Sequence, residues 1–343
     1  MQNNLFKFSD LYHAAGWLFT RIGYTLFSLP LLNRYATMKG RFKALTSEER
    51  FTVKKNLAST FGEARNEKEI DAIARRYFEF SSKFEMLLRV LPLKGFATPE
   101  HWPVEGLQHL EAALTQGKGV ILLSAHFGYA RFMKYILETS GRKIHVVGSQ
   151  FDRNSKAERR SKEFFNQLTA FGKQLHKRLA LPAFDFSFRD LYADFNIRPL
   201  LDVLQKNGII LIMGDGTRAS NLIPMDFLGR KLPFSAGTTR IALLTGATIL
   251  PAFAVDTNHG NGIKVIIEKP LVLEKNKASS PEVIAKNVAT FVQVLETYVK
   301  QYPQLYKVVY KEDRFARKMA RSQRDAAERY IPAGRTVGQN LVQ

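Results

Sequence analysis

The sequence predicts an α/β fold in which a mostly parallel or mixed central sheet is flanked by helices on both faces. Short, continuous apolar runs, typical of strands that are buried on both faces, recur from residue 120 onward. They alternate with segments of helical periodicity, which is the order that a parallel sheet requires. The strands are predicted at 120–123, 144–147, 209–213, 248–255, 263–267 and 306–310, and helices near 132–136 and at 157–171, 199–206, 237–245 and 281–301.

The composition indicates one enzyme-sized globular domain. The chain has 343 residues, of which 45% are hydrophobic, and this is enough to bury a large core. It has no cysteine, so disulfides, thiolate nucleophiles and cysteine-ligated metal sites are excluded.

The net charge narrows the class of partner. Lys and Arg number 51 against 31 Asp and Glu, which gives a formal charge of +20. Such a charge attracts nucleic acid, anionic lipid headgroups or acidic proteins. The basic residues are scattered through a core-forming pattern and no aromatic-interleaved reading motif is present, so nucleic-acid binding is the least favoured of the three.

The first 40 residues are predicted to associate with a membrane. Leu11 to Leu32 is an apolar run of roughly spanning length, but Arg21 lies in its middle. Because a charge near the bilayer centre is costly, a helix lying in the interface is favoured over a true span or a buried core helix. Asp10 before the run argues against a cleavable signal peptide.

The rest of the chain divides in two. Residues 41–316 are predicted to form the α/β domain, which begins with a helical scaffold over 41–92 whose start signal is Ser47-Glu48-Glu49. Residues 317–343 are a charged tail, for which a solvated helix is favoured over contact with a membrane surface.

Three loops that follow predicted strands carry residues suited to chemistry, because ligand sites in such sheets lie beyond the carboxyl ends of the strands. His126 follows the first strand and has the residue type of a general base. Gly214-Asp215-Gly216-Thr217-Arg218 follows the third and offers backbone N–H groups and a guanidinium to a phosphate. Phe227-Leu228-Gly229-Arg230-Lys231 and Phe234 to Gly237 lead into the next helix.

Each loop also has a purely structural interpretation. A histidine at a turn is often solvated, Gly-Asp-Gly is a common tight turn, and Gly-Arg-Lys is typical of a hairpin tip at the surface. The other six histidines have neither helical spacing nor metal-ligand spacing, so the sequence predicts no metal site.

Taken together and in order, these blocks resemble the bacterial lipid A late-acyltransferase family, within the wider group of glycerolipid acyltransferases. The resemblance covers about residues 10–315. It rests on Asn56-Leu57 and Phe61, Glu85, His126, the Gly-Asp-Gly-Thr-Arg block at 214–218, Phe227 to Gly229, Gly237 to Ala242, Thr245 to Ala247, Pro251, and Pro303 before the last strand.

The resemblance implies transfer of an acyl chain from an acyl carrier protein or coenzyme A thioester to a hydroxyl of a phosphorylated or glycosylated lipid. No cofactor is implied beyond the thioester, which is a co-substrate. It also implies a bacterial enzyme at the cytoplasmic face of the inner membrane, held peripherally or by one N-terminal anchor. An anionic membrane surface and acidic carrier protein both suit the basic charge.

The catalytic block departs from the family pattern. The family has His-x4-Asp or His-x4-Glu, in which the acid orients the histidine, whereas the fifth residue after His126 is Arg131. Three explanations stay open. A carboxylate is recruited from elsewhere, with Asp215 the first candidate and Asp185 or Glu138 weaker ones; or the acceptor is more acidic or an amine; or the chain is a degenerate member that binds lipid or carrier protein without turnover.

We therefore expect His126 and Asp215 to be catalytic. The residues expected to bind substrate, through its phosphate, ring or other anionic group, are Arg131, Gly216, Thr217, Arg218 and Arg240.

Overall fold

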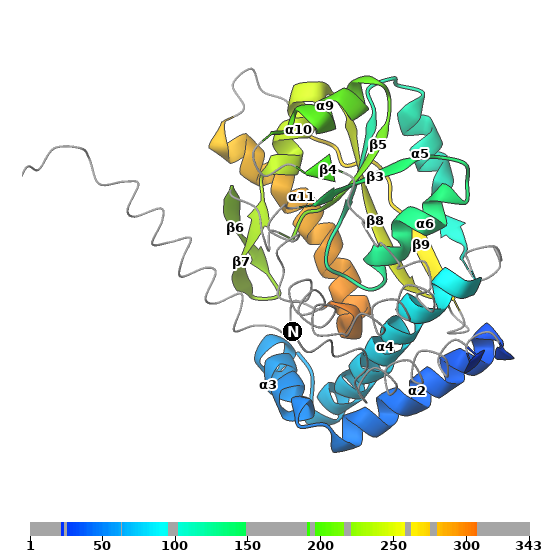
Figure 1. Ribbon diagram of the computed structural model, residues 1–343. Helices are drawn as coiled ribbons and strands as arrows, with labels where there is room; N and C mark the ends of the chain where they lie inside the picture. Colours follow the sequence, from blue (N-terminus) through cyan, green and yellow to red (C-terminus); the bar gives the residue numbers. More distant parts are fainter. Residues whose placement is uncertain are drawn as a thin grey trace, which may run out of the picture.

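The computed structural model of the chain has the α/β architecture that the sequence predicts (Figure 1). It describes residues 22–23, 26–62, 64–94, 102–148, 191–192, 196–215, 221–257, 262–274 and 280–306. The predicted helix at 157–171, the tail at 317–343 and most of the apolar run from Leu11 to Leu32 lie outside these residues.

The central sheet of the described residues has seven strands in the order β1-β9-β8-β2-β5-β3-β4. All neighbouring pairs are parallel except β8 and β9, so the sheet is mixed, as predicted. The strands are β1 (Val104–Glu105), β2 (Val120–Ser124), β3 (Ile144–Gly148), β4 (Leu191–Tyr192), β5 (Ile209–Met213), β8 (Thr248–Asp256) and β9 (Ile263–Ile267).

The central strands are apolar because helices cover both of their faces. Every residue of β2 is buried, and so are seven of the nine residues of β8. Figure 1 shows α5 (Leu107–Leu114) and α6 (Met133–Glu138) on one side of the sheet. On the other side lie α9 (Arg198–Gln205), α10 (Gly237–Thr245) and α11 (Pro281–Gln301). The predicted ranges of α10 and α11 are confirmed residue for residue.

One antiparallel hairpin, β6 (Leu222–Phe227) with β7 (Arg230–Ser235), was not predicted as strands. Its two-residue turn is Leu228-Gly229, with φ values of 53° and 73°. Positive φ at both turn residues is the geometry that matches the twist of a tight hairpin. A proline in each strand interrupts the alternation of apolar and polar residues that would have indicated strands. The Gly-Arg-Lys segment does lie at the tip of the hairpin, as the structural interpretation of this loop predicted.

The predicted strand at 306–310 is described only at Tyr306, which forms an isolated antiparallel bridge with Phe127. A 3-10 helix, η4 (Pro303–Leu305), precedes it. Residues 307–310 lie outside the described part of the chain.

The predicted helical scaffold over 41–92 is confirmed. It consists of α2 (Leu29–Thr46), α3 (Glu49–Phe61) and α4 (Glu67–Lys94), and α2 continues through residue 40 without a break. A Cβ at Gly40 would lie 2.5 Å from the Cα of Glu79, so glycine is required for α2 to approach α4 this closely. Among the described helices, none is long and apolar enough to cross a membrane.

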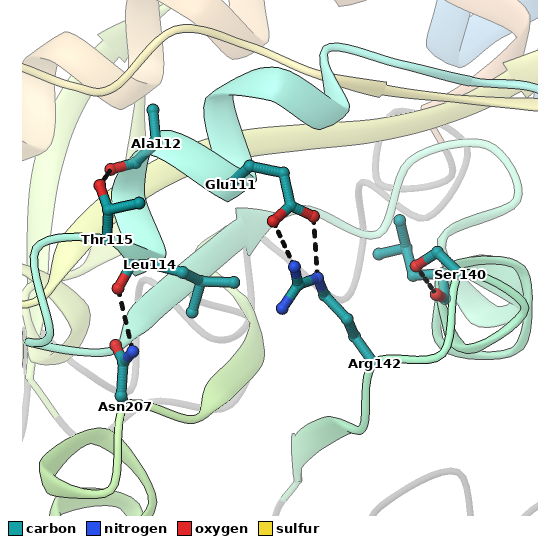
Figure 2. Close-up of polar contacts among 8 residues, drawn as sticks. Glu111, Ala112, Leu114, Thr115, Ser140, Arg142 and Asn207 are labelled. Atoms are coloured by element: carbon teal, nitrogen blue, oxygen red, sulfur yellow. Dashed lines mark hydrogen bonds and ion pairs between the residues drawn. The ribbon is translucent and has the colours of Figure 1, made fainter.

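The amino ends of the central strands are held by polar contacts between loops (Figure 2). Arg142, before β3, donates to both carboxylate oxygens of Glu111 on α5, with an Nε to Oε1 distance of 2.9 Å. Asn207, before β5, donates from Nδ2 to the carbonyl of Leu114 at 2.9 Å and accepts from the backbone N–H of Gly119 at 3.0 Å. Asn207 has φ 56°, a conformation that asparagine tolerates better than most residues.

Replacing Asn207 with alanine should lower the free energy of unfolding by about 1–3 kcal/mol, because both hydrogen bonds are lost and alanine tolerates positive φ poorly. Asn207→Gly should lose less, because it loses the same two hydrogen bonds but accepts the positive φ without strain. Urea denaturation followed by circular dichroism measures both variants, with the exposed Gln205→Ala as the control. Equal losses for the alanine and glycine variants would contradict a contribution from the backbone conformation.

Candidate active site

Two of the predicted site residues, His126 and Asp215, face each other at the carboxyl edge of the sheet. Strands β2 and β5 are parallel neighbours whose register pairs Ser124 with Met213. Each site residue comes two positions after its strand ends, so the register brings both to the same place. The backbone N–H of Gly214 donates to the carbonyl of Ser124 at 2.7 Å and ties the two loops together.

Asp215 holds both the ring and the backbone of His126. Its Oδ1 and Oδ2 lie 2.7 Å and 2.9 Å from the ring Nδ1, and Oδ2 also accepts from the His126 backbone N–H at 2.8 Å. The Asp215 side chain is fully buried, whereas that of His126 is 43% exposed. The carboxylate is thus shielded from water while the imidazole reaches the surface.

This arrangement selects one form of the imidazole. A carboxylate next to Nδ1 favours the tautomer in which Nδ1–H donates, which leaves the lone pair on Nε2. A carboxylate in this position is also the group that orients the histidine in catalytic triads. The pair has the composition and geometry of a general base with its orienting acid.

The loop that carries His126 is fixed by its backbone. Gly128 has φ 51°, and a Cβ there would lie 2.1 Å from the carbonyl oxygen of Ala254, so no larger residue fits. Its N–H donates to the carbonyl of Leu305 at 2.8 Å, and the next N–H, of Tyr129, donates to Ala254 at 2.9 Å. Neighbouring Phe127 is fully buried. His126 is therefore an exposed side chain on a rigidly held loop.

Tyr306 was not predicted to be part of this site. Its side chain is fully buried, its ring packs on Phe227 at 5.6 Å, and its backbone bridges to Phe127. Burial, and next the negative charge of Asp215, raise the pKa of the Tyr306 phenol well above its ordinary value. Tyr306 therefore stays neutral, and its buried phenol lies close enough to Asp215 for the carboxylate charge to act on it.

A second, partly buried polar contact near the site was not predicted from the sequence. Tyr129, three residues after His126, donates from its hydroxyl to Oδ1 of Asp256 at 2.9 Å, and Lys83 Nζ lies 3.9 Å from the same oxygen. Burial raises the pKa of Asp256, while the Lys83 charge and the Tyr129 hydroxyl oppose this shift. The contact joins α4, the end of β8 and the His126 loop. The position of Asp256 at the end of a strand was its only signal in the sequence.

Tyr129→Phe should lower the free energy of unfolding by about 1–3 kcal/mol, because it leaves the partly buried Asp256 carboxylate with one donor fewer. Since the pKa of Asp256 is raised in the folded state, its protonated form is favoured there, and its burial costs stability increasingly as pH rises above the ordinary value of 3.8. The deficit of Tyr129→Phe should therefore shrink as pH falls toward that value. Denaturant titrations across this range test it, with the exposed Tyr35→Phe as the control; a deficit that does not vary with pH would contradict the account.

Of the remaining predicted site residues, the structure describes Arg131 and Arg240 and does not describe the other three. Arg131 lies on the 3-10 helix η2 (Ala130–Phe132) and is exposed. Arg240 is exposed on the first turn of α10, a helix that starts beside the Asp215 loop because Ser235 N–H donates to the carbonyl of Gly214 at 3.2 Å. Gly216, Thr217 and Arg218 lie outside the described residues.

The two weaker carboxylate candidates are not seen beside His126. Asp185 lies outside the described residues. Glu138, at the end of α6, accepts from the backbone N–H of Ile144 at 3.2 Å and pairs with Lys134 at 4.0 Å. Asp215 is thus the carboxylate that the described structure places at the ring. Among the described residues, no group of three or more His, Asp or Glu is arranged to hold a metal ion.

The sequence of the chain matches the bacterial lipid A biosynthesis acyltransferase family over residues 5–312, which is nearly its whole length. The chain belongs to that family. A comparison with curated proteins found no match. The resemblance noted from the sequence blocks is thereby confirmed at the level of the family, and the chain is a member of a family of acyltransferases.

Because the chain belongs to this family, the arginine at position 131 is a departure from the family's His-x4-Asp/Glu pattern. In this lipid A acyltransferase family member, the position five residues after the histidine is cationic and exposed, while a carboxylate from the neighbouring loop lies against the ring. The carboxylate and the imidazole that lie in contact thus come from the loops after two adjacent strands, and not from one short motif.

Proposed function

We propose that this chain transfers an acyl group from an acyl carrier protein or coenzyme A thioester to a hydroxyl, or an amine, of a lipid or other amphiphilic acceptor, with His126 as the general base. The observation that carries the proposal is the 2.7 Å contact between the Nδ1 of His126 and the buried carboxylate of Asp215. It supplies the charge partner that the residue at position 131 cannot supply.

The proposed reaction proceeds by direct transfer. Nε2 of His126 takes the proton of the acceptor hydroxyl as its oxygen attacks the thioester carbonyl carbon. The tetrahedral intermediate then collapses, the carbon–sulfur bond breaks, and the imidazolium returns the proton to the departing thiolate. The products are the acylated acceptor and a free thiol. Asp215 stabilises the imidazolium between the two proton transfers, and no acyl-enzyme forms.

Basic and loop residues around this pair are proposed to hold the substrates. Arg131 would bind an anionic group, since a guanidinium presents several donors to a phosphate. Gly216, Thr217 and Arg218 would bind phosphate or the acceptor's ring from the loop after Asp215, and Arg240 would do so from α10. The formal charge of +20 suits an acidic carrier protein and an anionic lipid surface alike.

The proposed location is the cytoplasmic face of the bacterial inner membrane. Residues 1–40 would associate with the bilayer, either in its interface or as one anchor, while residues 41–316 form the enzyme domain and 317–343 a charged tail. Such an arrangement keeps the site beside an acceptor that resides in lipid.

The test is to incubate the purified protein with acyl thioester labelled in the acyl chain and with a bacterial lipid extract. Labelled lipid and an equal amount of free thiol are expected as products. Arg131→Glu should raise KM for one substrate about tenfold or more, because a bound anion would then meet a negative charge. An increase in kcat for this variant would instead mean that Arg131 occupies the place of a missing catalytic acid.

The same assay distinguishes an active acyltransferase from the alternative, a binding protein of the same fold without catalytic activity. In that case the protein would bind lipid or acyl carrier protein but release no thiol in the presence of any acceptor fraction. The carboxylate at His126 disfavours this alternative, because a protein without turnover has no need of an oriented base.

A further inference from the structure

Helix α2 carries an uncovered apolar stripe. Of the twelve large apolar side chains that are exposed in the described part of the chain, nine lie between Ile22 and Phe51. Five of them recur on α2 at spacings of four, three, four and three residues, with exposed fractions of 48% to 70%, and are Leu31, Tyr35, Met38, Phe42 and Leu45. At about 100° per residue this spacing aligns them along one side of the helix. We call these five residues the α2 stripe.

The opposite side of α2 explains how the helix is held. Leu32, Asn33, Ala36 and Gly40 are buried, and Gly40 lies against the backbone of α4. The α2 stripe therefore adds nothing to the core of the described structure. A contiguous exposed apolar surface of this kind marks a site of interaction.

The charges beside the stripe indicate what covers it. By helical geometry, Arg34 and Arg41 flank one edge, and Lys39 lies beyond the other. Arg41 pairs with Glu79 of α4 at 2.8 Å and Lys39 with Glu85 of α4 at 3.7 Å, and both cationic side chains stay more than one-third exposed. The helix contains no acidic residue. Apolar side chains bordered by cations on both edges are typical of helices that lie in the interface of an anionic bilayer.

The stripe lies on the same side of the molecule as the candidate active site. Helix α4 contacts the His126 loop through Phe80, whose ring centroid is 5.0 Å from that of Tyr129, and through the Lys83 pair with Asp256. It therefore lies against the carboxyl edge of the sheet. Figure 1 shows α2 on the outer side of α4, away from the sheet.

We propose that α2 docks in the surface plane of an anionic membrane, with the α2 stripe inserted among the acyl chains and the basic edges at the headgroups. This orientation turns the edge of the sheet that carries His126 toward the bilayer. The inference deepens the proposed function, on which it rests, because it names the surface through which the enzyme meets a lipid acceptor.

The first experiment measures binding to vesicles of phosphatidylglycerol and phosphatidylethanolamine by sedimentation. Met38→Ser/Phe42→Ser should weaken binding about a hundredfold or more, because two large side chains no longer leave water. The matched control is Leu244→Ser/Val272→Ser, which removes two exposed apolar residues elsewhere and should change binding less than about threefold. Equal losses in the two variants, or none in the first, would overturn the proposal.

The second experiment reports insertion without removing the stripe. The chain has no cysteine, so Met38→Cys can be labelled at one site with a polarity-sensitive fluorophore. Its emission should shift to the blue on addition of the vesicles and be quenched by nitroxide groups on the lipid chains. The label on Leu244→Cys should show neither change. A Met38→Cys label that stays in water while the protein is bound would contradict insertion of α2.

Activity measurements separate this inference from the proposed function. Met38→Ser/Phe42→Ser should retain most transfer to acceptor dispersed in detergent and lose it on vesicles. Absence of transfer by the wild-type protein in detergent would count against the acyl-transfer proposal and not against docking. If the wild-type protein is a dimer in light scattering without lipid, and the double variant a monomer, the stripe joins two copies of the chain and the membrane assignment is wrong.

Discussion

Asp215→Asn should lower kcat by about 10³- to 10⁴-fold. The asparagine fits the same space but cannot stabilise an imidazolium by charge, and its amide group can donate to Nδ1, which selects the unproductive tautomer. Because the Asp215 side chain is fully buried, KM is expected to change little. Steady-state kinetics with the labelled thioester measure both quantities.

The matched control for this change is Asp226→Asn. Asp226 lies on the β6–β7 hairpin, its side chain is 80% exposed, and it pairs with Lys231 at 2.6 Å. Its replacement should leave kcat within about twofold, as expected for a surface ion pair. If Asp215→Asn loses no more activity than Asp226→Asn, Asp215 is not the acid that supports His126, and the catalytic assignment of the pair is wrong.

His126→Ala should lower kcat by at least about 10⁴-fold, since it removes the proton acceptor itself. Because the two residues act as one unit, the double variant with Asp215→Asn should be hardly slower than His126→Ala alone. Release of free thiol is the sensitive readout. His109→Ala, on α5, is the control and should retain full activity.

Two outcomes would oppose this account. Residual transfer by His126→Ala near the wild-type rate would mean that another residue takes the acceptor's proton. Losses that multiply in the double variant would mean that His126 and Asp215 act independently, in spite of their contact. A thermal melt of each variant is needed in both cases, because Asp215 also accepts the backbone N–H of His126 at 2.8 Å and so contributes to the structure of the loop.

Local patterns in the sequence were sufficient for most of the fold. The strands β2, β5 and β8 are recognisable in the sequence as apolar runs because most of their residues on both faces are buried, which leaves little room for polar residues. Helix α11 is visible from its periodicity and from Ser280 at its start, whose hydroxyl accepts the N–H of Val283. Such signals depend on neighbours within one or two turns.

Features that depend on contacts between residues far apart in the chain could not be predicted from the sequence. The β6–β7 hairpin carries a proline in each strand and a positive φ at Leu228, neither of which suggests a strand pair. The contact of Tyr129 with Asp256 joins residues 127 positions apart. Membrane association was predicted for residues 1–40, but only the packing of the other side of α2 against α4 shows which apolar residues of this helix are exposed.

The sequence by itself determined the family, the strand before His126 and the identity of the residue at position 131. It could nominate Asp215 but could not place it, because the two residues are 89 positions apart. Only the parallel pairing of β2 with β5 decides that they meet, since its register sets both loops at the same height of the sheet. A charge partner is defined by distance in space, and in this protein the sheet register supplies a partner that the short motif lacks.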